Sequence, residues 1–563
     1  MKRRQPIHSA PMLVFAMAAG HVPAQPPLPG AAPHEFTQDP PAPPGPVRLS
    51  PAYSPRDTTL RQVNVGPQGM NIVGDAANEP SLAIDPTAPN RLAIGWRQFD
   101  SIASNFRQAG RAYSTDGGRT WTNPGPLDPG IFRSDPVLRA DAQGRLYYCS
   151  LTTSPYQTWV FVSTDGGATF PSVYTSFGDD KQWLTVDVSG APTAGALYQH
   201  WSVIQSTSNF TRSFNQAQTW TTPIPRVPVW GISDVGPAGQ LYIGGQFSPG
   251  GSGPIQVARS LNAGVAAQTP AFTTVTVPMG TFRSFVTGSP NPGGLLGQVQ
   301  VAVDRSGGPR HGWVYVLCSV RVGTTDPLDV YFNRSTDGGQ SWLPAPIRVN
   351  NDPANAGAWQ WFGTLSVAPD GRLDAVWNDT RESLSVTSSR LYYAFSADGG
   401  TTWQGNTGIG PSYNSLVGWP NQNKMGDYYD MASDRVGASL AYATTYNGEQ
   451  DVYFLRINDW DCNGNGIADG ADLLAGTLHD CDADGVPDEC ELAAGVPVPC
   501  AGCYPNCDGS TAAPILNVQD FGCFLTRYAA GEPYANCDGS TVPPALNVQD
   551  FGCFLTKYAA GCP

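Results

Sequence analysis

The chain has 563 residues, a formal net charge of −14 and twelve cysteines. Fifteen acidic but only two basic residues follow residue 458, so nearly all of the net negative charge belongs to the C-terminal tail. No basic patch is present that would neutralise the phosphates of a nucleic acid, which argues against a nucleic-acid partner. No later segment approaches the roughly 18 apolar residues that a membrane span requires.

The first 24 residues have the pattern of a secretory signal peptide. Basic residues 2–4 precede an apolar run from Pro11 to Gly20, and a small-residue cleavage site ends at Ala24. Residues 25–60 are rich in proline and lack apolar periodicity, which indicates a linker that buries no core. We therefore expect an exported protein, either secreted or attached to a cell surface.

Residues 61–458 contain short strand patterns separated by clusters of Gly, Pro, Asn and Asp. The strands come in sets of three, and a fold of this kind, with a repeat of roughly 50–70 residues, is an all-β propeller. We count seven blades, with six as the alternative, and expect residues 61–65 to close the ring against the last blade. The predicted sets begin at Glu79, Asp135, Lys181, Val229, Val299, Trp361 and Asp427.

One eight-residue phrase ends four of the third strands. The clear copies are STDGGRTW (114–121), STDGGATF (163–170), STDGGQSW (335–342) and SADGGTTW (396–403), and degraded copies occupy 213–220 and 260–264. We expect the aspartate to accept amide hydrogen bonds of its own turn, the glycines to supply positive φ, and the aromatic residue to fill the space between blades. The phrase resembles the Asp-box, or bacterial neuraminidase repeat, of sialidases and other propellers. A binding site is then expected on the opposite face, where the first strands begin.

Carboxylates, arginines and aromatic residues gather at that opposite face, where first strands begin and second strands end. Arginines pair with carboxylates and aromatic rings stack on sugars, so the combination suits an anionic or sugar ligand. The alternative is that these charged residues are solvated or cap turns, and that Trp361 packs between blades. The candidate substrate-binding residues are Arg97, Arg133, Arg321, Asp379, Arg381 and Trp361.

Residues 61–458 also resemble exported sialidase-like proteins, through the Asp-boxes, the phrase NEPSLAIDPTAPNRLAIGW and the phrase WNDTR. The resemblance implies an arginine cluster, a tyrosine nucleophile activated by a glutamate, and an aspartate that acts as acid and base. By this resemblance Asp135 is the acid, and Tyr428 or Tyr446 with Glu449 is the nucleophile pair. The candidate catalytic residues are Glu79, Asp135, Asp427, Tyr428 and Glu449.

The chain departs from the sialidase pattern in two respects. The arginine-isoleucine-proline phrase is absent, with only a loose counterpart at FRSDP (132–136), and the blade count is seven where sialidases have six. Asp-box propellers with seven blades include xyloglucan-cleaving enzymes and receptor-type propellers that bind without chemistry. The sequence therefore supports two alternative hypotheses. The protein is either a glycoside hydrolase or a non-catalytic propeller that binds a glycan or a protein.

Residues 459–500 contain two acidic loops, DCNGNGIADGAD and DCDADGVPDECE, that resemble the calcium loops of thrombospondin type 3 repeats and dockerins. Each loop has a carboxylate or amide side chain at positions 1, 3, 5, 9 and 12 and a glycine at position 6. Ca²⁺ requires six to eight oxygen ligands, and the glycine permits the sharp turn that gathers them. The candidate Ca²⁺ ligands are Asp461, Asn463, Asn465, Asp469, Asp472, Asp480, Asp482, Asp484, Asp488 and Glu491.

Residues 501–563 contain two copies of a unit with a period of 30 residues, each a polar loop followed by a short amphipathic helix. The unit resembles a duplicated dockerin module of the cysteine-bearing (GC) type, which implies docking to a cohesin-like or cell-surface partner; the alternative is a small stability cap. An insertion before Asn517 leaves open whether the loops at 506–520 and 536–550 bind calcium. Ten of the twelve cysteines lie beyond residue 461, which indicates a disulfide-rich tail of undetermined pairing.

Overall fold

The computed structural model describes residues 38–42, 48–55, 59–153, 155–202, 207–225, 227–247, 253–323, 326–354, 356–475, 477–480, 486–494, 496, 498, 504–508, 516–538, 540 and 544–560. The expected signal peptide lies outside these residues, as do most of the proline-rich linker and the candidate ligands Asp482 and Asp484. None of the helices within the described part of the chain is long and apolar enough to cross a membrane.

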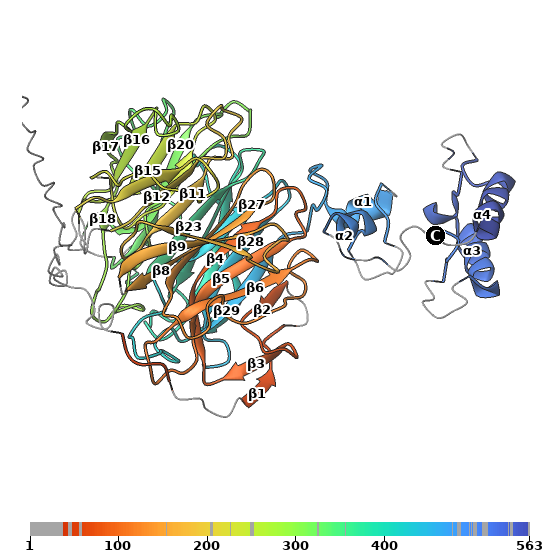
Figure 1. Ribbon diagram of the computed structural model, residues 1–563, viewed down its shortest axis with the longest axis horizontal. Coiled ribbons are helices and arrows are strands. Elements are labelled where there is room, and N and C mark those ends of the chain that lie inside the picture. Colours follow the sequence, from red (N-terminus) through yellow and green to blue (C-terminus); the bar gives the residue numbers. More distant parts are fainter. Residues whose placement is uncertain are drawn as a thin grey trace, which may run out of the picture.

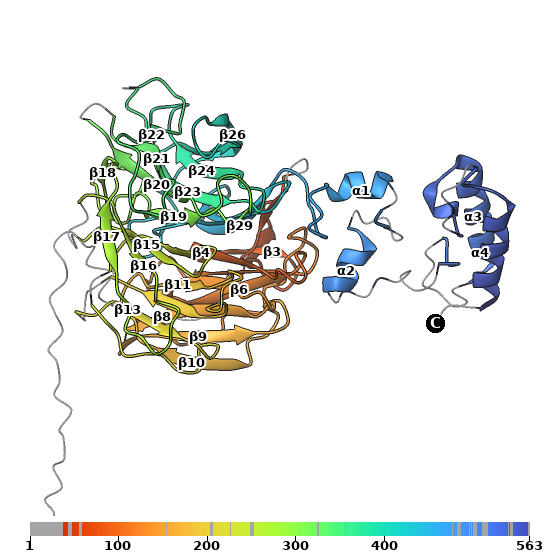
Figure 2. The same cartoon turned by 90° about the horizontal axis from the view of Figure 1, so that it is seen from above.

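Seven innermost strands form a closed ring, in which each contacts the next and the last contacts the first. This arrangement confirms the all-β propeller with seven blades (Figures 1 and 2). The innermost strands are β4 (Ala76–Ile84), β7 (Ser134–Ala140), β11 (Trp183–Val186), β14 (Ser233–Val235), β19 (Gln300–Val303), β23 (Gln360–Val367) and β27 (Asp430–Ser433).

Each inner strand pairs antiparallel with a second strand, which pairs antiparallel with a third. The second strands are β5 (Leu92–Phe99), β8 (Leu146–Thr153), β12 (Leu197–His200), β15 (Leu241–Gly245), β20 (Val314–Arg321), β24 (Leu373–Asp379) and β28 (Ala438–Thr444). The third strands are β6 (Gln108–Ser114), β9 (Tyr156–Ser163), β13 (Phe210–Ser213), β16 (Gln256–Ser260), β21 (Asp329–Ser335), β25 (Ser389–Ser396) and β29 (Asp451–Ile457).

An outer fourth strand completes several of the blades. In the last blade it is β2 (Leu60–Gln62), which pairs with β29 and so joins the N-terminal segment to the end of the ring. Two short elements lie beside the blades: β1 (Arg48–Pro51) pairs with β3 (Met70–Val73), and β18 (Thr281–Phe282) pairs with β20. The other outer strands are β10 (Ser172–Ser176), β17 (Thr273–Thr276), β22 (Ile347–Arg348) and β26 (Gln404–Tyr413).

The hydrophobic core lies between neighbouring blades. One cluster joins Ile94 and Trp96 of the first blade to Ala441 and Phe454 of the last, which extends the core across the closure of the ring. Removal of this apolar surface from water contributes about 25 cal/mol per Å² buried, and no blade can bury both of its faces alone. The closed ring is therefore the unit that folds.

The repeated Asp-box phrase forms one turn with the same hydrogen bonds in each copy. In the first copy the Asp116 carboxylate accepts hydrogen bonds from the Thr120 amide at 2.9 Å and from the Ser114 hydroxyl at 2.7 Å. Gly117 and Gly118 have φ of 72° and 91°, a conformation that favours glycine. The Trp121 ring lies 5.3 Å from that of Phe454 in the last blade. The phrase is therefore a turn that helps to join neighbouring blades.

Arginines on third strands add a second connection between blades. Arg111 Nη1 donates to the carbonyl oxygen of Ala168 at 2.9 Å, and Arg334 Nη1 donates to that of Gly399 at 2.8 Å. In both cases the acceptor belongs to the Asp-box turn of the next blade. Arg259 donates in the same way to Gly338 at 2.8 Å. These bonds help to satisfy the carbonyl oxygens of the turns, and the Tyr242 hydroxyl also donates to the Gly338 carbonyl oxygen at 3.3 Å.

The tail contains four helices: α1 (Asp469–Ala475), α2 (Asp488–Ala494), α3 (Val518–Ala530) and α4 (Val548–Ala560). A 3₁₀ turn, η2 (Pro533–Ala535), connects the last two helices. Trp460 fixes the start of the tail to the propeller, since its indole donates to the Gly117 carbonyl oxygen at 2.9 Å beneath the Arg119 guanidinium. Helices α1 and α2 lie near the blades, and α3 and α4 lie farther out (Figures 1 and 2).

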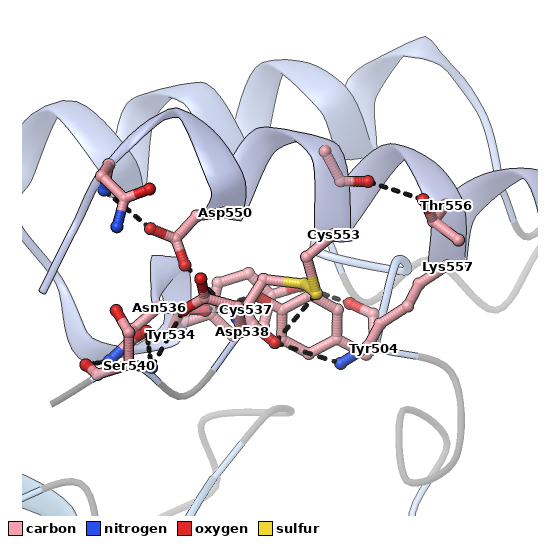
Figure 3. Close-up of a disulfide and its surroundings, with 12 residues drawn as sticks. Tyr504, Tyr534, Asn536, Cys537, Asp538, Ser540, Asp550, Cys553, Thr556 and Lys557 are labelled. Carbon is pink, nitrogen blue, oxygen red and sulfur yellow. Dashed lines mark hydrogen bonds between the residues drawn. A yellow bond between two sulfur atoms is a disulfide. The ribbon is translucent and has the colours of Figure 1, made fainter.

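Within the described part of the tail, three disulfides connect a loop to a helix. The structure pairs Cys462 with Cys490, Cys507 with Cys523, and Cys537 with Cys553. In the last copy, shown in Figure 3, the Asp550 carboxylate accepts hydrogen bonds from the Asn547 and Asp538 amides. The two copies pack against each other through stacked rings of Phe524 and Phe554, whose centroids are 4.1 Å apart.

Asp337→Ala should lower the free energy of unfolding by about 1–2 kcal/mol, because the Asp-box turn at 335–342 then loses the acceptor of the Ser341 amide and hydroxyl. Asp337→Asn is the matched control and should cost less than half as much, because Asn215 accepts the corresponding Thr219 amide in a degraded copy. Denaturant unfolding of the full chain measures both changes. Equal losses for alanine and asparagine would contradict this role of the carboxylate.

Candidate functional site

Charged side chains from four blades meet where the inner strands begin, on the face opposite the Asp-boxes. We call Glu79, Arg97, Asp135, Lys181, Lys424, Asp427 and Tyr428 the mouth cluster. Glu79 and Asp135 lie near the starts of β4 and β7, Lys181 precedes β11, Asp427 and Tyr428 precede β27, and Arg97 lies near the end of β5. The Lys181 ammonium donates to Gln298 Oε1 at 2.6 Å, and Gln298 precedes β19 of the fifth blade. The cluster thus spans the mouth of the channel.

The backbone directs three of these side chains by the same distortion. Glu79, Asp135 and Lys181 have φ of 50°, 52° and 56°, in the left-handed region that residues with a side chain seldom adopt. The register of β4 with β5 and of β7 with β8 shifts at Glu79 and Asp135 respectively, as in a β-bulge. Each such residue costs roughly 1–3 kcal/mol, which the surrounding sheet must offset. Trp230 and Phe362, near the starts of β14 and β23, have φ of 65° and 59°, so the distortion also occurs in blades that contribute only core side chains at this position.

Glu79 is fully buried between two cations. Its Oε1 lies 3.1 Å from Arg97 Nη2 and 3.6 Å from Lys424 Nζ. Burial raises the pKa of Glu79 to about 8, because the loss of hydration and the nearby Asp427 and Asp135 outweigh the two cations. Neither carboxylate oxygen accepts a hydrogen bond from the described residues. The raised pKa favours the protonated form of Glu79 at neutral pH.

Asp427 has the opposite character. Its Oδ2 accepts a hydrogen bond from Lys424 Nζ at 2.9 Å and its Oδ1 accepts one from the Leu295 amide at 2.8 Å. Although burial opposes ionisation, Lys424, Arg97 and the Leu295 amide hold the pKa of Asp427 below its usual range. The Lys424 ammonium thus contacts both carboxyl groups. The distance between Glu79 Oε1 and Asp427 Oδ2 therefore cannot exceed the sum of these two contact distances.

Asp135 is also held as a carboxylate. It accepts hydrogen bonds from the Ser134 hydroxyl at 2.5 Å and the Lys181 amide at 2.8 Å. Burial opposes ionisation, but Arg97 and the Ser134 hydroxyl lower the pKa of Asp135. Asp135 is 4% exposed, whereas the Asp427 side chain is 13% exposed and is the more accessible of the two aspartates.

Tyr428 lies in the cluster but is held by the backbone. Its hydroxyl donates to the Pro136 carbonyl oxygen at 2.8 Å, and Lys181 Nζ lies 3.8 Å from the centre of its ring. Burial, together with Glu79 and Asp135, raises the pKa of Tyr428 well above 10. Among the described residues, its hydroxyl thus bonds to a backbone carbonyl oxygen and not to a carboxylate that would activate it as a nucleophile.

The structure places Glu449 elsewhere. Its oxygens accept hydrogen bonds from the Gly74 amide at 2.6 Å and from Asn71 Nδ2 at 3.1 Å, beside the last blade. The alternative tyrosine, Tyr446, shares a hydrogen bond of 3.1 Å with Tyr442. The tyrosine–glutamate pair implied by the sialidase resemblance is therefore not assembled among the described residues.

Of the six residues predicted to bind substrate, only Arg97 joins the mouth cluster. Arg133 pairs with Asp128 at 2.5 Å and lies over the Trp159 ring. Arg321 ends β20, in register with Thr281 of β18. The other three belong to the sixth blade, where Arg381 pairs with Asp379 at 2.7 Å and Trp361 is a core residue whose indole donates to Ser389. Packing within and between blades accounts for these three.

Several polar residues of the mouth were absent from the sequence-based site. Lys181 occupies in its blade the same starting position as Glu79 and Asp135, so the alignment of the repeats contains a signal for it. Lys424 lies in a loop that the repeat pattern does not define. Four nearly or fully buried side chains near the cluster each have an atom without a hydrogen bond among the described residues: Gln182 Oε1, Trp183 Nε1, His200 Nε2 and Gln298 Nε2. Such atoms require water or a ligand.

No protein-family model and no curated protein sequence matches this chain. Among solved structures, the chain is similar to a protein of unknown function from Dyadobacter fermentans, at 13% identity and a TM-score of 0.36, over 71% of this chain and 99% of that one. It is similar to the Trypanosoma rangeli sialidase at 12% identity and a TM-score of 0.34, over 69% of this chain and 56% of the sialidase. A polysaccharide lyase of family PL25, an ulvan lyase, matches at 11% identity and a TM-score of 0.35, over 68% and 94%. At these values the similarity concerns the fold.

The first acidic loop of the tail has donor atoms that fit calcium. Asp461 Oδ1 and Asp469 Oδ2 are buried and accept no hydrogen bond from the described residues. The amides of Asn463 and Asn465 approach Asp472 Oδ2 at 3.3 and 2.8 Å, so the side chains at positions 3, 5 and 12 already converge. Carboxylate and amide oxygens are the ligands that Ca²⁺ prefers. The second loop falls partly outside the described residues.

Tyr428→Phe should lower the free energy of unfolding by about 1 kcal/mol, through loss of the hydrogen bond to Pro136. The turnover of any glycan substrate should stay within about tenfold of that of the parent protein, whereas loss of a nucleophile lowers turnover by several orders of magnitude. Steady-state kinetics and thermal unfolding of the full chain measure the two effects. Tyr446→Phe, outside the mouth cluster, is the control, and abolition of turnover only in the Tyr428 variant would restore a nucleophilic role.

Proposed function

We propose that this protein is an exported glycan-acting hydrolase and that the mouth cluster supplies its acid and its base. One observation carries the proposal: Glu79 and Asp427 contact the same Lys424 ammonium, yet the pKa of Glu79 is raised to about 8 while that of Asp427 lies below its usual range. Two carboxyl groups whose environments separate their pKa values are the usual acid and base of such a site.

In this scheme Glu79 donates its proton to the glycosidic oxygen as the bond to the sugar breaks. Asp427 accepts a proton from the water that attacks the anomeric carbon, so that each product leaves with a free hydroxyl group at the cleaved position. Carboxyl groups about 6.5–9.5 Å apart on either side of the bond perform this inverting reaction in glycoside hydrolases, whereas groups about 5–5.5 Å apart react through a covalent intermediate. Asp427 is preferred over Asp135 as the base because it is the more exposed.

The charge of the mouth favours an anionic sugar as the substrate. Arg97, Lys181 and Lys424 are nearly or fully buried, and each interacts electrostatically with carboxylates of the mouth cluster. When Glu79 is protonated, the mouth cluster contains these three cations and two ionised aspartates. Its net charge is therefore positive. A substrate carboxylate or sulfate would neutralise that excess, with Arg97 as the residue suited to a planar anion.

A non-catalytic binding propeller is the second candidate, and one observation favours it. Glu79 and Arg97 are fully buried, so a substrate must displace part of the mouth before it reaches them. A binding protein would instead use the exposed rim and retain the mouth cluster as buried ion pairs. Saturable glycan binding without any product would support this candidate.

For the tail we propose Ca²⁺ binding at the two acidic loops and docking of the exported propeller to a partner at a cell surface. The donor atoms of the first loop support the calcium assignment. The contact of Trp460 with the Asp-box of the first blade supports a fixed connection between propeller and tail. The repeated disulfide-linked helices support a docking module, whose partner would be cohesin-like.

Glu79→Gln should reduce turnover at least about hundredfold, because the amide retains the shape of the side chain but has no proton to donate. In the parent protein, turnover should decline as pH rises through about 8, when Glu79 loses its proton, and should persist well into the acidic range because Asp427 stays ionised. A panel of sialosides, uronides and plant oligosaccharides, followed by product chromatography, measures this. Glu382→Gln, an exposed carboxyl paired with Arg390, is the control. No product from any substrate would overturn the hydrolase proposal.

Asp461→Asn combined with Asp472→Asn should remove one Ca²⁺ per full chain, because both side chains lie in the first acidic loop with oxygens turned inward. Isothermal titration of the chelator-treated protein counts the sites. Asp459→Asn, outside the twelve-residue loop, is the matched control and should retain the parent stoichiometry. An unchanged stoichiometry in the double variant would contradict calcium binding by this loop.

A further inference from the structure

Residues 38–42 of the proline-rich N-terminal segment lie against the face of the propeller that carries the mouth cluster. The Asp39 amide donates to Asn105 Oδ1 at 2.7 Å, and the Asn105 amide donates to Asp39 Oδ2 at 2.9 Å. The Ser104 hydroxyl donates to the Pro40 carbonyl oxygen at 2.9 Å. Both acceptor and donor residues of the propeller lie between the end of β5 and the start of β6. We call residues 38–42 the strap.

The strap also contacts a second segment of that face. Residues 414–429, which we call the mouth loop, connect β26 of the sixth blade to β27 of the seventh. Asn421 Nδ2 in this loop donates to Asp39 Oδ2 at 2.8 Å, and the Asn421 amide donates to the Ser104 carbonyl oxygen at 3.3 Å. One carboxylate oxygen of Asp39 therefore accepts hydrogen bonds from both the first blade and the mouth loop.

The mouth loop lies directly against Glu79. A Cβ atom placed on Gly426 would lie 2.6 Å from Glu79 Cγ, so the backbone of the loop packs on the glutamate side chain. Gln422 of the loop accepts a hydrogen bond from Arg97 Nη2 at 3.3 Å. The loop also supplies Lys424, whose side chain is 2% exposed. The loop therefore helps to seal Glu79 and Arg97 from solvent, and a substrate needs it to move.

The mouth loop is held more firmly at one end than at the other. Asn291, in the segment before β19, accepts a hydrogen bond from the Met425 amide at 2.7 Å and donates one to the Gly426 carbonyl oxygen at 2.9 Å. These two bonds are buried, whereas Asn421 is exposed and Asp39 is only partly buried. Hydrogen bonds that water can replace open at low cost. We therefore expect the contact with the strap to open before the contact with Asn291.

We propose that the strap is a releasable latch. While Asp39 holds Asn421, the mouth loop stays closed over Glu79, and release of residues 38–42 lets the loop open and admit a ligand. The inference rests on the proposed function, since it takes the mouth cluster as the place where a substrate binds. It accounts for a proposed acid, Glu79, that is fully buried in the structure. The chain then has a closed form and an open form, and the strap sets the balance between them.

Lysine labelling of the full chain tests the latch without knowledge of the substrate. The chain has lysines at positions 2, 181, 424 and 557. Lys424 of the mouth loop is buried, whereas Lys557 of the tail is exposed and serves as the internal reference. Asp39→Ala removes the shared acceptor, so Lys424 should react with acetic anhydride at least about fivefold faster than in the parent protein, relative to Lys557. Peptide mass spectrometry measures both rates.

Two variants and one lysine are the controls. Asp39→Asn retains an acceptor oxygen and should accelerate the labelling of Lys424 less than Asp39→Ala does. Asp370→Ala removes an exposed carboxylate that accepts an amide of its own turn between β23 and β24, on the Asp-box face, and should leave the labelling at the parent rate. Lys181, which donates to Gln298, should also keep its parent rate, because opening of the loop does not unfold the third blade.

Equal labelling of Lys424 in the parent protein and in Asp39→Ala overturns the latch. An equal acceleration of Lys181 and Lys424 also overturns it, because that result indicates general unfolding. On a glycan that the parent protein cleaves, Asp39→Ala should raise the turnover at low substrate concentration, since more of the protein is in the open form. Absence of turnover in every variant would contradict the hydrolase proposal, while the labelling rates would still decide the latch.

Discussion

The structure depends on closure of a ring, because no blade buries its two faces alone. Each apolar cluster extends from one blade to the next, and the cluster around Trp96 and Phe454 crosses the point where the two ends of the propeller meet. Closure is secured by β2, which adds a strand from the N-terminal segment to the last blade. The same closure brings the starts of seven inner strands to one axis. Residues that are far apart in the sequence, such as Glu79 and Lys424, thereby become neighbours.

The two faces of the ring have different physical tasks. On one face, the Asp-box turns satisfy their own amides, and arginines of the preceding blade satisfy their carbonyl oxygens. The charged side chains of that face therefore form hydrogen bonds within and between turns. On the other face, charged residues lie near the axis, where both Glu79 carboxylate oxygens have no hydrogen bond among the described residues. A cluster that buries Glu79 among Arg97 and Lys424 is costly to assemble, because each charged group loses its hydration.

Periodic features were predictable from the sequence. The strand sets, their number and the Asp-box turns follow from patterns that repeat in each blade, and the structure confirms the seven-bladed propeller. Part of the mouth was predictable as well, because Glu79, Arg97, Asp135, Asp427 and Tyr428 stand at the beginnings and ends of predicted strands. Residues such as Arg381 and Asp379 have the same positions in their blade, but the structure pairs them with each other. Strand-end position alone does not distinguish a ligand site from a local ion pair.

The sequence by itself determined the class of fold, the direction of the strands and the face on which charges gather, because these depend on local periodicity and turn chemistry. Only the tertiary structure decided which charges meet. Lys424 comes from a loop without a repeat pattern, and its contact with Glu79 exists because the last blade closes against the first. Its other carboxylate partner, Asp427, lies only three residues away in the same loop. The raised pKa of Glu79 likewise requires burial at the axis, which no local pattern encodes. Long-range closure of the ring is therefore the physical reason why the site could be located on a face but not assembled from the sequence.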